Sequence, residues 1–314
     1  MKRLSRSVGS AVNRLLAVLG VRLVRISPPP AFQPNWFSGL KAPPDHPLPR
    51  ILAQHPSYQR NLADLAKQIS RKYPKAGIVD IGANVGDTAA LIRSVCDATL
   101  ICIEPDESFY SYLQENTAAM KDITLARCFL GDVSGNSANG YVPLRRDGTM
   151  QLIPSNGHSV ATVTFDELRR SSFAAIPIKL IKIDADGFDT RILRGASQCL
   201  EREKPALYFE YDPTYLRSTD PRYRETTCGL IDLGYSRVVI FDHLGKLLLW
   251  SSDNVIGLLD QLDQYLDGDR LLAYVDICLL SNADADIYET LVGLGNSHPA
   301  PAAGKSLKPT SAVT

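Results

Sequence analysis

Residues 77–91, with the sequence GIVDIGANVGDTAAL, most constrain what this chain can fold into. They begin with the apolar side chains of Ile78, Val79 and Ile81, which are typical of a strand buried on both faces. Two glycines and an asparagine at 82–86 then supply residue types that tolerate the positive φ of a tight turn. Asp87 and Thr88 are predicted to cap a helix that follows. This order predicts a nucleotide-binding turn, because the free N–H groups of the helix start face the ligand.

Three residues indicate which cofactor this turn binds. Glu104 ends a second predicted strand, residues 99–105 (TLICIEP), where a carboxylate can accept both ribose hydroxyls of a nucleoside. Asn84 occupies the place of the middle glycine in a dinucleotide-binding turn. Asp80 would repel the pyrophosphate of NAD, whereas it attracts the amino group and sulfonium of S-adenosylmethionine. The pattern therefore favours S-adenosylmethionine, and a nicotinamide-dependent oxidoreductase is the alternative.

A second strand-to-turn stretch carries the candidate chemistry. Residues 176–196 read IPIKLIKIDADGFDTRILRGA, and a strand is predicted at 178–183 with Asp184 and Asp186 at its exit. The carboxyl ends of parallel strands meet at one edge of a sheet, so these acids should lie near Glu104. We predict Asp184 as the general base that takes the proton of an acceptor hydroxyl. Plain helix capping is the alternative role for these two acids.

The remaining candidate site residues follow from their places in the predicted strands and turns. The further candidates for the base are Glu210, Asp186, His158 and His243. The predicted cofactor-binding residues are Asp80, Gly82, Asn84, Gly86, Glu104, Pro105, Asp132 and Asp184. Asp132 follows a third predicted strand, 123–129, whose end should lie where an adenine ring would rest. We predict no bound metal, and a divalent ion held by Asp184, Asp186 and Glu210 is the alternative.

Charge and cysteine content limit the class of partner and the compartment. The 314 residues contain 34 Lys or Arg and 34 Asp or Glu, so the net charge is zero. A chain with this balance has no overall field that attracts nucleic acid, and we predict no nucleic-acid partner. The six cysteines form no C-x-x-C pair, and several lie in apolar runs. We therefore expect reduced packing residues in a cytoplasmic protein.

The two ends of the chain differ from its middle. Residues 1–26 alternate basic and apolar side chains, and their longest apolar stretch is far shorter than the about 20 residues that span a bilayer. They predict a basic amphipathic helix, which either lies on the anionic inner face of a membrane or packs on its own domain or on a second copy in a homodimer. Residues 27–50 are proline-rich and predict an extended linker. Residues 295–314 lack aromatics and predict a disordered tail.

Taken together, the motifs resemble the FkbM family of S-adenosylmethionine-dependent methyltransferases. They are DIGANVGDT, IEP, GD-x-x-G at 131–135, TFDEL, KIDADGFDTRILRGA and PALYFE. The resemblance covers residues 77–250. It implies a class I methyltransferase fold in which helices cover both faces of a Rossmann-like sheet of order 3-2-1-4-5-7-6, with strand 7 antiparallel. The family often has glutamate where this chain has Asp186.

The resemblance also implies an activity and a domain range. We expect a methyltransferase domain at residues 51–285, with an inserted β-hairpin between 133 and 165. The expected reaction is O-methylation of a hydroxyl on a sugar, a polysaccharide precursor or another secondary metabolite, so the partner is a small-molecule or glycan acceptor. The other alternative is a non-catalytic, membrane-associated partner in glycan assembly.

Overall fold

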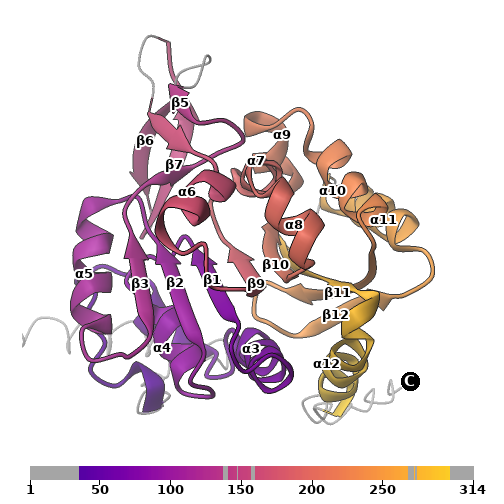
Figure 1. Ribbon diagram of the computed structural model, residues 1–314, viewed down its shortest axis with the longest axis horizontal. Coiled ribbons are helices and arrows are strands. Elements are labelled where there is room, and N and C mark those ends of the chain that lie inside the picture. Colours follow the sequence, from indigo (N-terminus) through magenta and orange to yellow (C-terminus); the bar gives the residue numbers. More distant parts are fainter. Residues whose placement is uncertain are drawn as a thin grey trace, which may run out of the picture. The chain divides into compact units, whose positions relative to one another are not determined.

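The computed structural model describes residues 35–136, 141–146, 148–156, 160–267, 272 and 274–297. An eight-stranded sheet runs through this part of the chain in the order β12-β11-β13-β10-β9-β1-β2-β3 (Figure 1). Its strands are β1 (Gly77–Ile81), β2 (Thr99–Ile103), β3 (Ile123–Ala126), β9 (Ile178–Ile183), β10 (Ala206–Tyr211), β11 (Tyr235–Asp242), β12 (Leu247–Ser251) and β13 (Val275–Ser281).

The strand directions confirm the predicted sheet. The strands from β3 through β2, β1 and β9 to β10 are all parallel to their neighbours, and β13 is antiparallel to both β10 and β11. If β9, β10, β11 and β13 are counted as strands 4, 5, 6 and 7, this is the predicted order 3-2-1-4-5-7-6 with an antiparallel seventh strand. The strand β12 adds an eighth member at the edge, where it pairs antiparallel with β11.

Helices cover both faces of the sheet because successive strand residues point to opposite sides. Val79 and Ile81 of β1 belong to one apolar cluster, and Ile78 belongs to the other. The first cluster is completed by α6 (Phe165–Ser172), α7 (Asp189–Gly195), α8 (Ser197–Glu203), α9 (Pro213–Thr219), α10 (Tyr223–Asp232) and α11 (Val255–Asp267). The second is completed by α3 (Arg60–Lys72), α4 (Asp87–Arg93), α5 (Glu107–Thr117) and α12 (Ala285–Ser297).

The predicted insertion forms β-structure at the end of the sheet where β1 and β2 terminate. The strands β6 (Tyr141–Arg146) and β7 (Thr149–Pro154) pair antiparallel as a hairpin, seen at the top of Figure 1. Beside it, β4 (Phe129–Leu130), β8 (Ala161–Val163) and β5 (Gly135–Asn136) form a three-stranded sheet. The predicted strand at 123–129 is therefore divided, because the chain leaves the main sheet after Ala126.

Segments at both ends of the expected domain differ from prediction. The short helix η1 (Asn35–Phe37) and the helix α2 (Leu48–Gln54) lie partly in the predicted linker. Phe37, Leu48 and Leu52 form a small apolar cluster, so this part of the linker packs instead of remaining extended. Near the other end, α12 follows η2 (Asn282–Asp284) and continues past residue 285, and it packs on the sheet through Ile287. The start of the predicted tail, residues 295–297, is thus helical.

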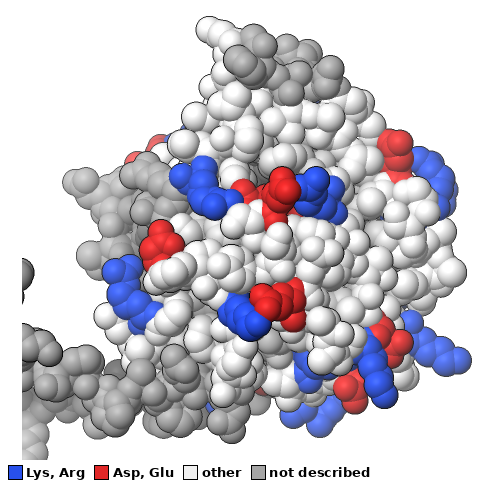
Figure 2. Space-filling model, turned by 90° about the vertical axis from the view of Figure 1, so that its left-hand side faces the viewer, with Lys and Arg blue, Asp and Glu red and all other residues white. Residues whose placement is uncertain are grey.

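The described surface mixes charges of both signs. Figure 2 shows basic and acidic side chains close to one another on the face that includes α5. Two ion pairs that α5 contributes are Arg127–Glu107, 3.2 Å apart, and Lys41–Glu115. Of the helices that the structure describes, none is both long and apolar enough to cross a membrane. Residues 1–26 lie outside the described residues, and so does most of the tail.

Candidate active site

A cavity of about 650 Å³ opens at the carboxyl ends of the parallel strands. Its wall combines the turn after β1, the end of β2, the turn after β9 and the end of β10. The β6–β7 hairpin and the start of α2 complete it. In open α/β sheets this edge is where ligands bind, because the strand order reverses beside it.

The turn after β1 is fixed by its glycines. Gly82 has φ of 77°, and a Cβ placed there would lie 1.9 Å from the Asp184 carbonyl oxygen, so only glycine lets the two turns approach. Gly86 has φ of 87° and precedes α4 as its N-cap. It does not line the cavity, and a Cβ there would approach Leu113. The predicted side-chain cap is absent from α4, since Asp87 is the first helical residue and makes no capping bond.

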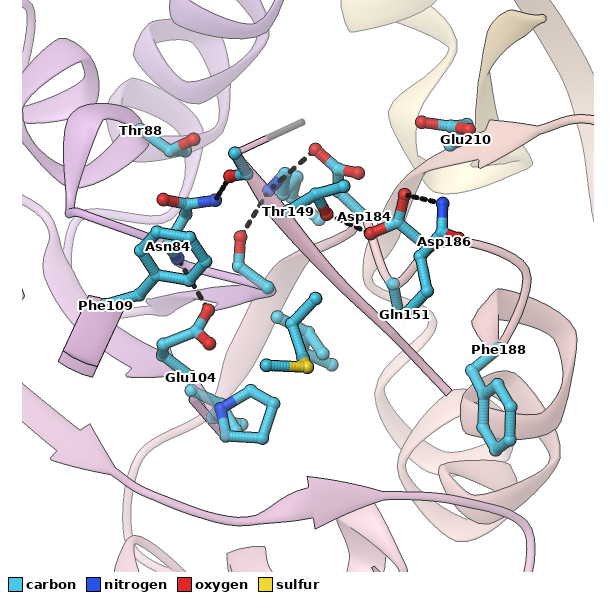
Figure 3. A pocket seen from close by; sticks show the side chains of 18 of the residues that line it. Asn84, Thr88, Glu104, Phe109, Thr149, Gln151, Asp184, Asp186, Phe188 and Glu210 are labelled. Carbon is cyan, nitrogen blue, oxygen red and sulfur yellow. Dashed lines mark hydrogen bonds and ion pairs between the residues drawn. The ribbon is translucent and has the colours of Figure 1, made fainter. Parts of the chain in front are cut away.

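The Glu104 carboxylate is held by backbone donors at the end of β2. Its Oε2 accepts a 2.8 Å hydrogen bond from the Asn84 N–H, and its Oε1 accepts one of 2.8 Å from the Asp106 N–H. Burial raises the pKa of Glu104 to about 7, although these two bonds oppose the shift. Each oxygen keeps a second lone pair that can accept a ligand hydroxyl. Figure 3 shows this carboxylate beside Asn84 and Phe109, and Pro105 also lines the cavity.

Asp80 lies beneath the site rather than in its wall. It is 1% exposed and does not line the cavity. The Lys182 ammonium lies 3.0 Å from Asp80 Oδ1 and 3.5 Å from Asp184 Oδ2, and it donates a 3.1 Å hydrogen bond to the Gly82 carbonyl. Burial raises the pKa of Asp80, and the charge of Lys182 acts against that rise. The expected direct contact of Asp80 with the cofactor is therefore replaced by a buried ion pair.

The turn after β9 carries two carboxylates with different surroundings. Asp184 lines the cavity with its side chain 41% exposed and pairs with Lys182. Asp186, at φ of 48°, accepts hydrogen bonds from Thr149 and, at 3.5 Å, from Gln151. Burial raises its pKa to about 6. Because Thr149 and Gln151 belong to β7, these bonds tie the hairpin to the turn (Figure 3).

Glu210 at the end of β10 also lines the cavity. It makes no hydrogen bond or ion pair with any residue that the structure describes, and it stands apart from the bonded Asp186 in Figure 3. Burial raises its pKa well above the usual range, and the negative charge of Asp184 adds to the rise. Asp184 and Glu210 thus reach one cavity, as predicted, from the ends of neighbouring strands.

Asp132 and His243, two further predicted site residues, lie outside the cavity wall. Asp132 pairs with Arg191, Arg194 and Arg222 at 2.9, 3.2 and 3.1 Å, and it does not line the cavity, so the expected adenine contact is absent. His243 packs against Tyr274 but is not in the wall. His158 lies outside the described residues. Within the described ranges, no three His, Cys, Asp or Glu side chains are grouped to hold a metal, so the divalent-ion alternative gains no support.

Sequence reasoning missed several residues of the wall. His46 lies with its Nε2 3.1 Å from Asn84 Oδ1 and packs edge-on against Phe109, and burial lowers its pKa. Tyr58 and Tyr274 also line the cavity. None of the three stands in a local motif, and His46 falls in the predicted linker, so no sequence signal marked them.

A sheet of this order with an antiparallel seventh strand and a glycine turn after β1 defines the fold of a class I methyltransferase. A family model described as the methyltransferase FkbM domain matches residues 80–238, just over half of the chain, and the chain belongs to that family. The predicted resemblance is confirmed. Its cofactor is S-adenosylmethionine.

Comparison with solved structures found several methyltransferases of low sequence identity. The methyltransferase FkbM from Methylobacillus flagellatus KT is 17% identical, with 65% of this chain and 43% of that chain covered and a TM-score of 0.39. This chain thus spans less than half of that protein. An O-methyltransferase from Bacillus cereus in complex with SAH is 11% identical, covering 86% and 97%, with a TM-score of 0.41. A putative caffeoyl-CoA O-methyltransferase from Staphylococcus aureus is 13% identical, covering 74% and 91%, with a TM-score of 0.40. A search of the curated proteins gave no match.

Proposed function

We propose that this methyltransferase transfers the methyl group of S-adenosylmethionine to a hydroxyl oxygen of a sugar, a polysaccharide precursor or another secondary metabolite. The observation that carries the proposal is the convergence of Glu104 and Asp184 on one cavity from the ends of β2 and β9. We assign Glu104 to the cofactor ribose and Asp184 to the acceptor.

The residues fit the cofactor at three points. Glu104 offers two oxygens with free lone pairs, which accept the ribose hydroxyls. Gly82 leaves the backbone of the turn open to the cavity, and Pro105 lines the wall next to Glu104. The bound cofactor supplies an electrophilic methyl carbon on a positively charged sulfur. The protein therefore has to orient the acceptor and exclude water.

Asp184 acts on the acceptor. Its carboxylate would take the hydroxyl proton of the acceptor as the acceptor oxygen displaces S-adenosylhomocysteine from the methyl carbon. Glu210 is the second candidate for this role, because it faces the same cavity without a protein partner among the described residues. The β6–β7 hairpin, which is bonded to Asp186 and Asn84, limits the access of water to the cavity on the side that it covers.

A binding and product assay tests the proposal. We expect the purified chain to bind S-adenosylmethionine and not NAD in titration calorimetry, and to release S-adenosylhomocysteine when a panel of hydroxyl-bearing glycan precursors is added. Preferential binding of NAD would favour the oxidoreductase alternative. Binding of S-adenosylmethionine without product from any acceptor would favour the non-catalytic glycan-assembly partner.

The membrane contact and the homodimer expected for residues 1–26, together with the cytoplasmic location, remain proposals that rest on the sequence. Six basic residues lie in that segment, and its first acidic neighbour is Asp45. This pattern supports contact with anionic lipid on the inner membrane face.

A further inference from the structure

Three polar groups in the cavity wall have no hydrogen-bond partner in the part of the chain that the structure describes. They are the hydroxyls of Tyr58 and Tyr274 and the carboxyl group of Glu210. Each of the three residues is half-buried, and its polar group is free to bond a ligand in the cavity, since no described residue bonds it. A few convergent polar groups in a largely apolar cavity are what fix the orientation of a small ligand, so three together favour a polar one.

These groups come from distant parts of the sequence but lie near one another. Burial raises the pKa of Tyr274, and Tyr58 and Glu210 are the next largest causes of that rise. The negative charge of Asp184 raises the pKa of Tyr58 and that of Glu210 as well. All three groups therefore lie within the electrostatic reach of Asp184, the candidate base, in the wall of one cavity.

The charge of the wall limits what binds there. Its acidic side chains are Asp87, Glu104, Asp184, Asp186, Glu210 and Asp212. Its only lysine among the described residues, Lys182, is already paired with Asp80 and Asp184. Burial lowers the pKa of His46, which favours its neutral form. Among the described residues, the wall has no arginine and no unpaired lysine, so an anionic group entering this cavity would face carboxylates, which is unfavourable at low dielectric.

We propose that Tyr58, Tyr274 and Glu210 form an acceptor subsite that binds an uncharged, hydroxyl-rich group such as a neutral sugar ring, and that this subsite discriminates against sugars carrying phosphate or carboxylate. This inference rests on the proposed methyl transfer. A phenol hydroxyl donates one hydrogen bond and accepts others, so two of them match neighbouring hydroxyls of a ring. Glu210, whose pKa is raised, holds a proton more readily than an ordinary carboxyl group and can donate it in a further hydrogen bond.

A binding experiment with three sugars tests the charge preference. The full chain is first saturated with S-adenosylhomocysteine, and methyl glucoside, glucose 6-phosphate and glucuronate are then titrated with binding followed by NMR. We expect methyl glucoside to bind at least about tenfold more tightly than either anionic sugar. Equal or tighter binding of an anionic sugar would overturn the inference. So would failure of methyl glucoside to bind a chain that does bind S-adenosylhomocysteine.

Matched substitutions test the residues. Tyr58→Phe and Tyr274→Phe keep the ring and remove only the hydroxyl, so each should weaken binding of methyl glucoside roughly three- to tenfold. Affinity for S-adenosylhomocysteine should change by less than about twofold, because the cofactor contacts lie at Glu104. The control is Tyr265→Phe, since Tyr265 is 48% exposed on α11 and is not in the wall. Unchanged glucoside affinity in both variants would overturn the assignment, whereas a chain that binds neither S-adenosylmethionine nor S-adenosylhomocysteine would refute the proposed function itself.

Discussion

The side-chain amide of Asn84 donates a hydrogen bond of 3.0 Å to the backbone carbonyl of Gly148. The same side chain lies 3.1 Å from the His46 ring through its Oδ1, and the Asn84 N–H donates to Glu104. One residue of the turn after β1 thus contacts the hairpin, the segment before α2 and the Glu104 carboxylate. This arrangement links the β6–β7 hairpin to the turn after β1, where we propose that the cofactor binds.

Replacing Asn84 with glycine should loosen the contact between the β6–β7 hairpin and the turn after β1. Asn84 has φ of 47°, which glycine adopts freely, so Asn84→Gly removes the side-chain bonds without backbone strain. Loss of two hydrogen bonds, each worth about 0.5–1.5 kcal/mol, should weaken S-adenosylmethionine binding roughly tenfold and expose the hairpin to proteolysis. Asp122→Gly is the matched control, since Asp122 has φ of 52° and does not line the cavity. Equal affinities in both variants would argue against the coupling.

The ion pair beneath the cavity should matter for stability. Lys182 and Asp80 are 3% and 1% exposed, and Lys182→Met leaves the carboxylate buried without its partner. We expect the free energy of unfolding to fall by about 3–5 kcal/mol in urea denaturation. Lys41→Met is the control, because Lys41 forms an exposed pair worth about 0–1 kcal/mol. A similar loss in the two variants would show that burial is not the cause.

Much of the site could be predicted because its signals are local in sequence. The apolar run of β1, the glycine turn and Glu104 fall within one short stretch, and the parallel sheet then brings Asp184 and Glu210 to the same edge. The Asp80–Lys182 pair was not predicted, although these residues are register partners in β1 and β9. The sequence shows Lys182 as an interruption of an apolar run, and the predicted strand order puts its strand beside that of Asp80, but the register of the two strands does not follow from that order.

The missed features depend on tertiary packing. His46, Tyr58 and Tyr274 reach the cavity from segments that carry no motif, so their roles follow only from how those segments pack. Asp132 has the expected place in the sequence, but arginines of α7 and of the turn before α10 pair with its carboxylate. Such pairing compensates a partly buried carboxylate for its lost hydration, which a neutral adenine contact does less well.

Truncation separates the two halves of the predicted N-terminal region. Deleting residues 1–34 leaves every described residue of the cavity wall in place, so S-adenosylmethionine binding should stay within about twofold of the full chain. Deleting residues 1–54 removes His46, Leu48 and Ile51 from the wall and should abolish binding in calorimetry. The membrane proposal adds that only the full chain sediments with anionic vesicles. Equal sedimentation of the full chain and the shorter truncation would contradict it.

Glu104 should give cofactor binding a characteristic pH dependence. Its pKa is about 7 in the ligand-free protein, and ribose hydroxyls donate to the ionised form, so binding favours loss of the proton. Affinity for S-adenosylmethionine should therefore rise from about pH 6 to about pH 8 and then level off. Glu104→Gln should weaken binding at least about tenfold at the higher pH and remove this dependence. The control is Glu107→Gln, an exposed acid outside the wall.

The raised pKa of Glu104 also makes folding stability depend on pH, and stability should fall as the pH rises, whereas cofactor affinity should increase. The folded-state pKa of Glu104 lies above its ordinary value of 4.5, so its contribution is fully present below that value and is lost as the pH rises through about 7. The ligand-free chain should accordingly lose thermal stability between about pH 5 and about pH 8, and Glu104→Gln should reduce that loss. A wild-type loss that Glu104→Gln leaves undiminished would mean that other buried carboxyl groups control it.

Asp184 should matter more for turnover than for cofactor affinity. It ends β9, beside Glu210 and the acceptor subsite, whereas Glu104 ends β2. Asp184→Asn keeps the shape of the side chain and removes its charge, so the turnover number should fall roughly 10²–10⁴-fold, the contribution typical of a general base. The dissociation constant of S-adenosylmethionine should change only about a few fold, as for an interaction made mainly in the transition state. Asp97→Asn, at a fully exposed acid, is the control. If Asp184→Asn instead turns over normally and binds the cofactor poorly, Asp184 is a cofactor ligand, and Glu210 becomes the base to test by the same substitution to the amide.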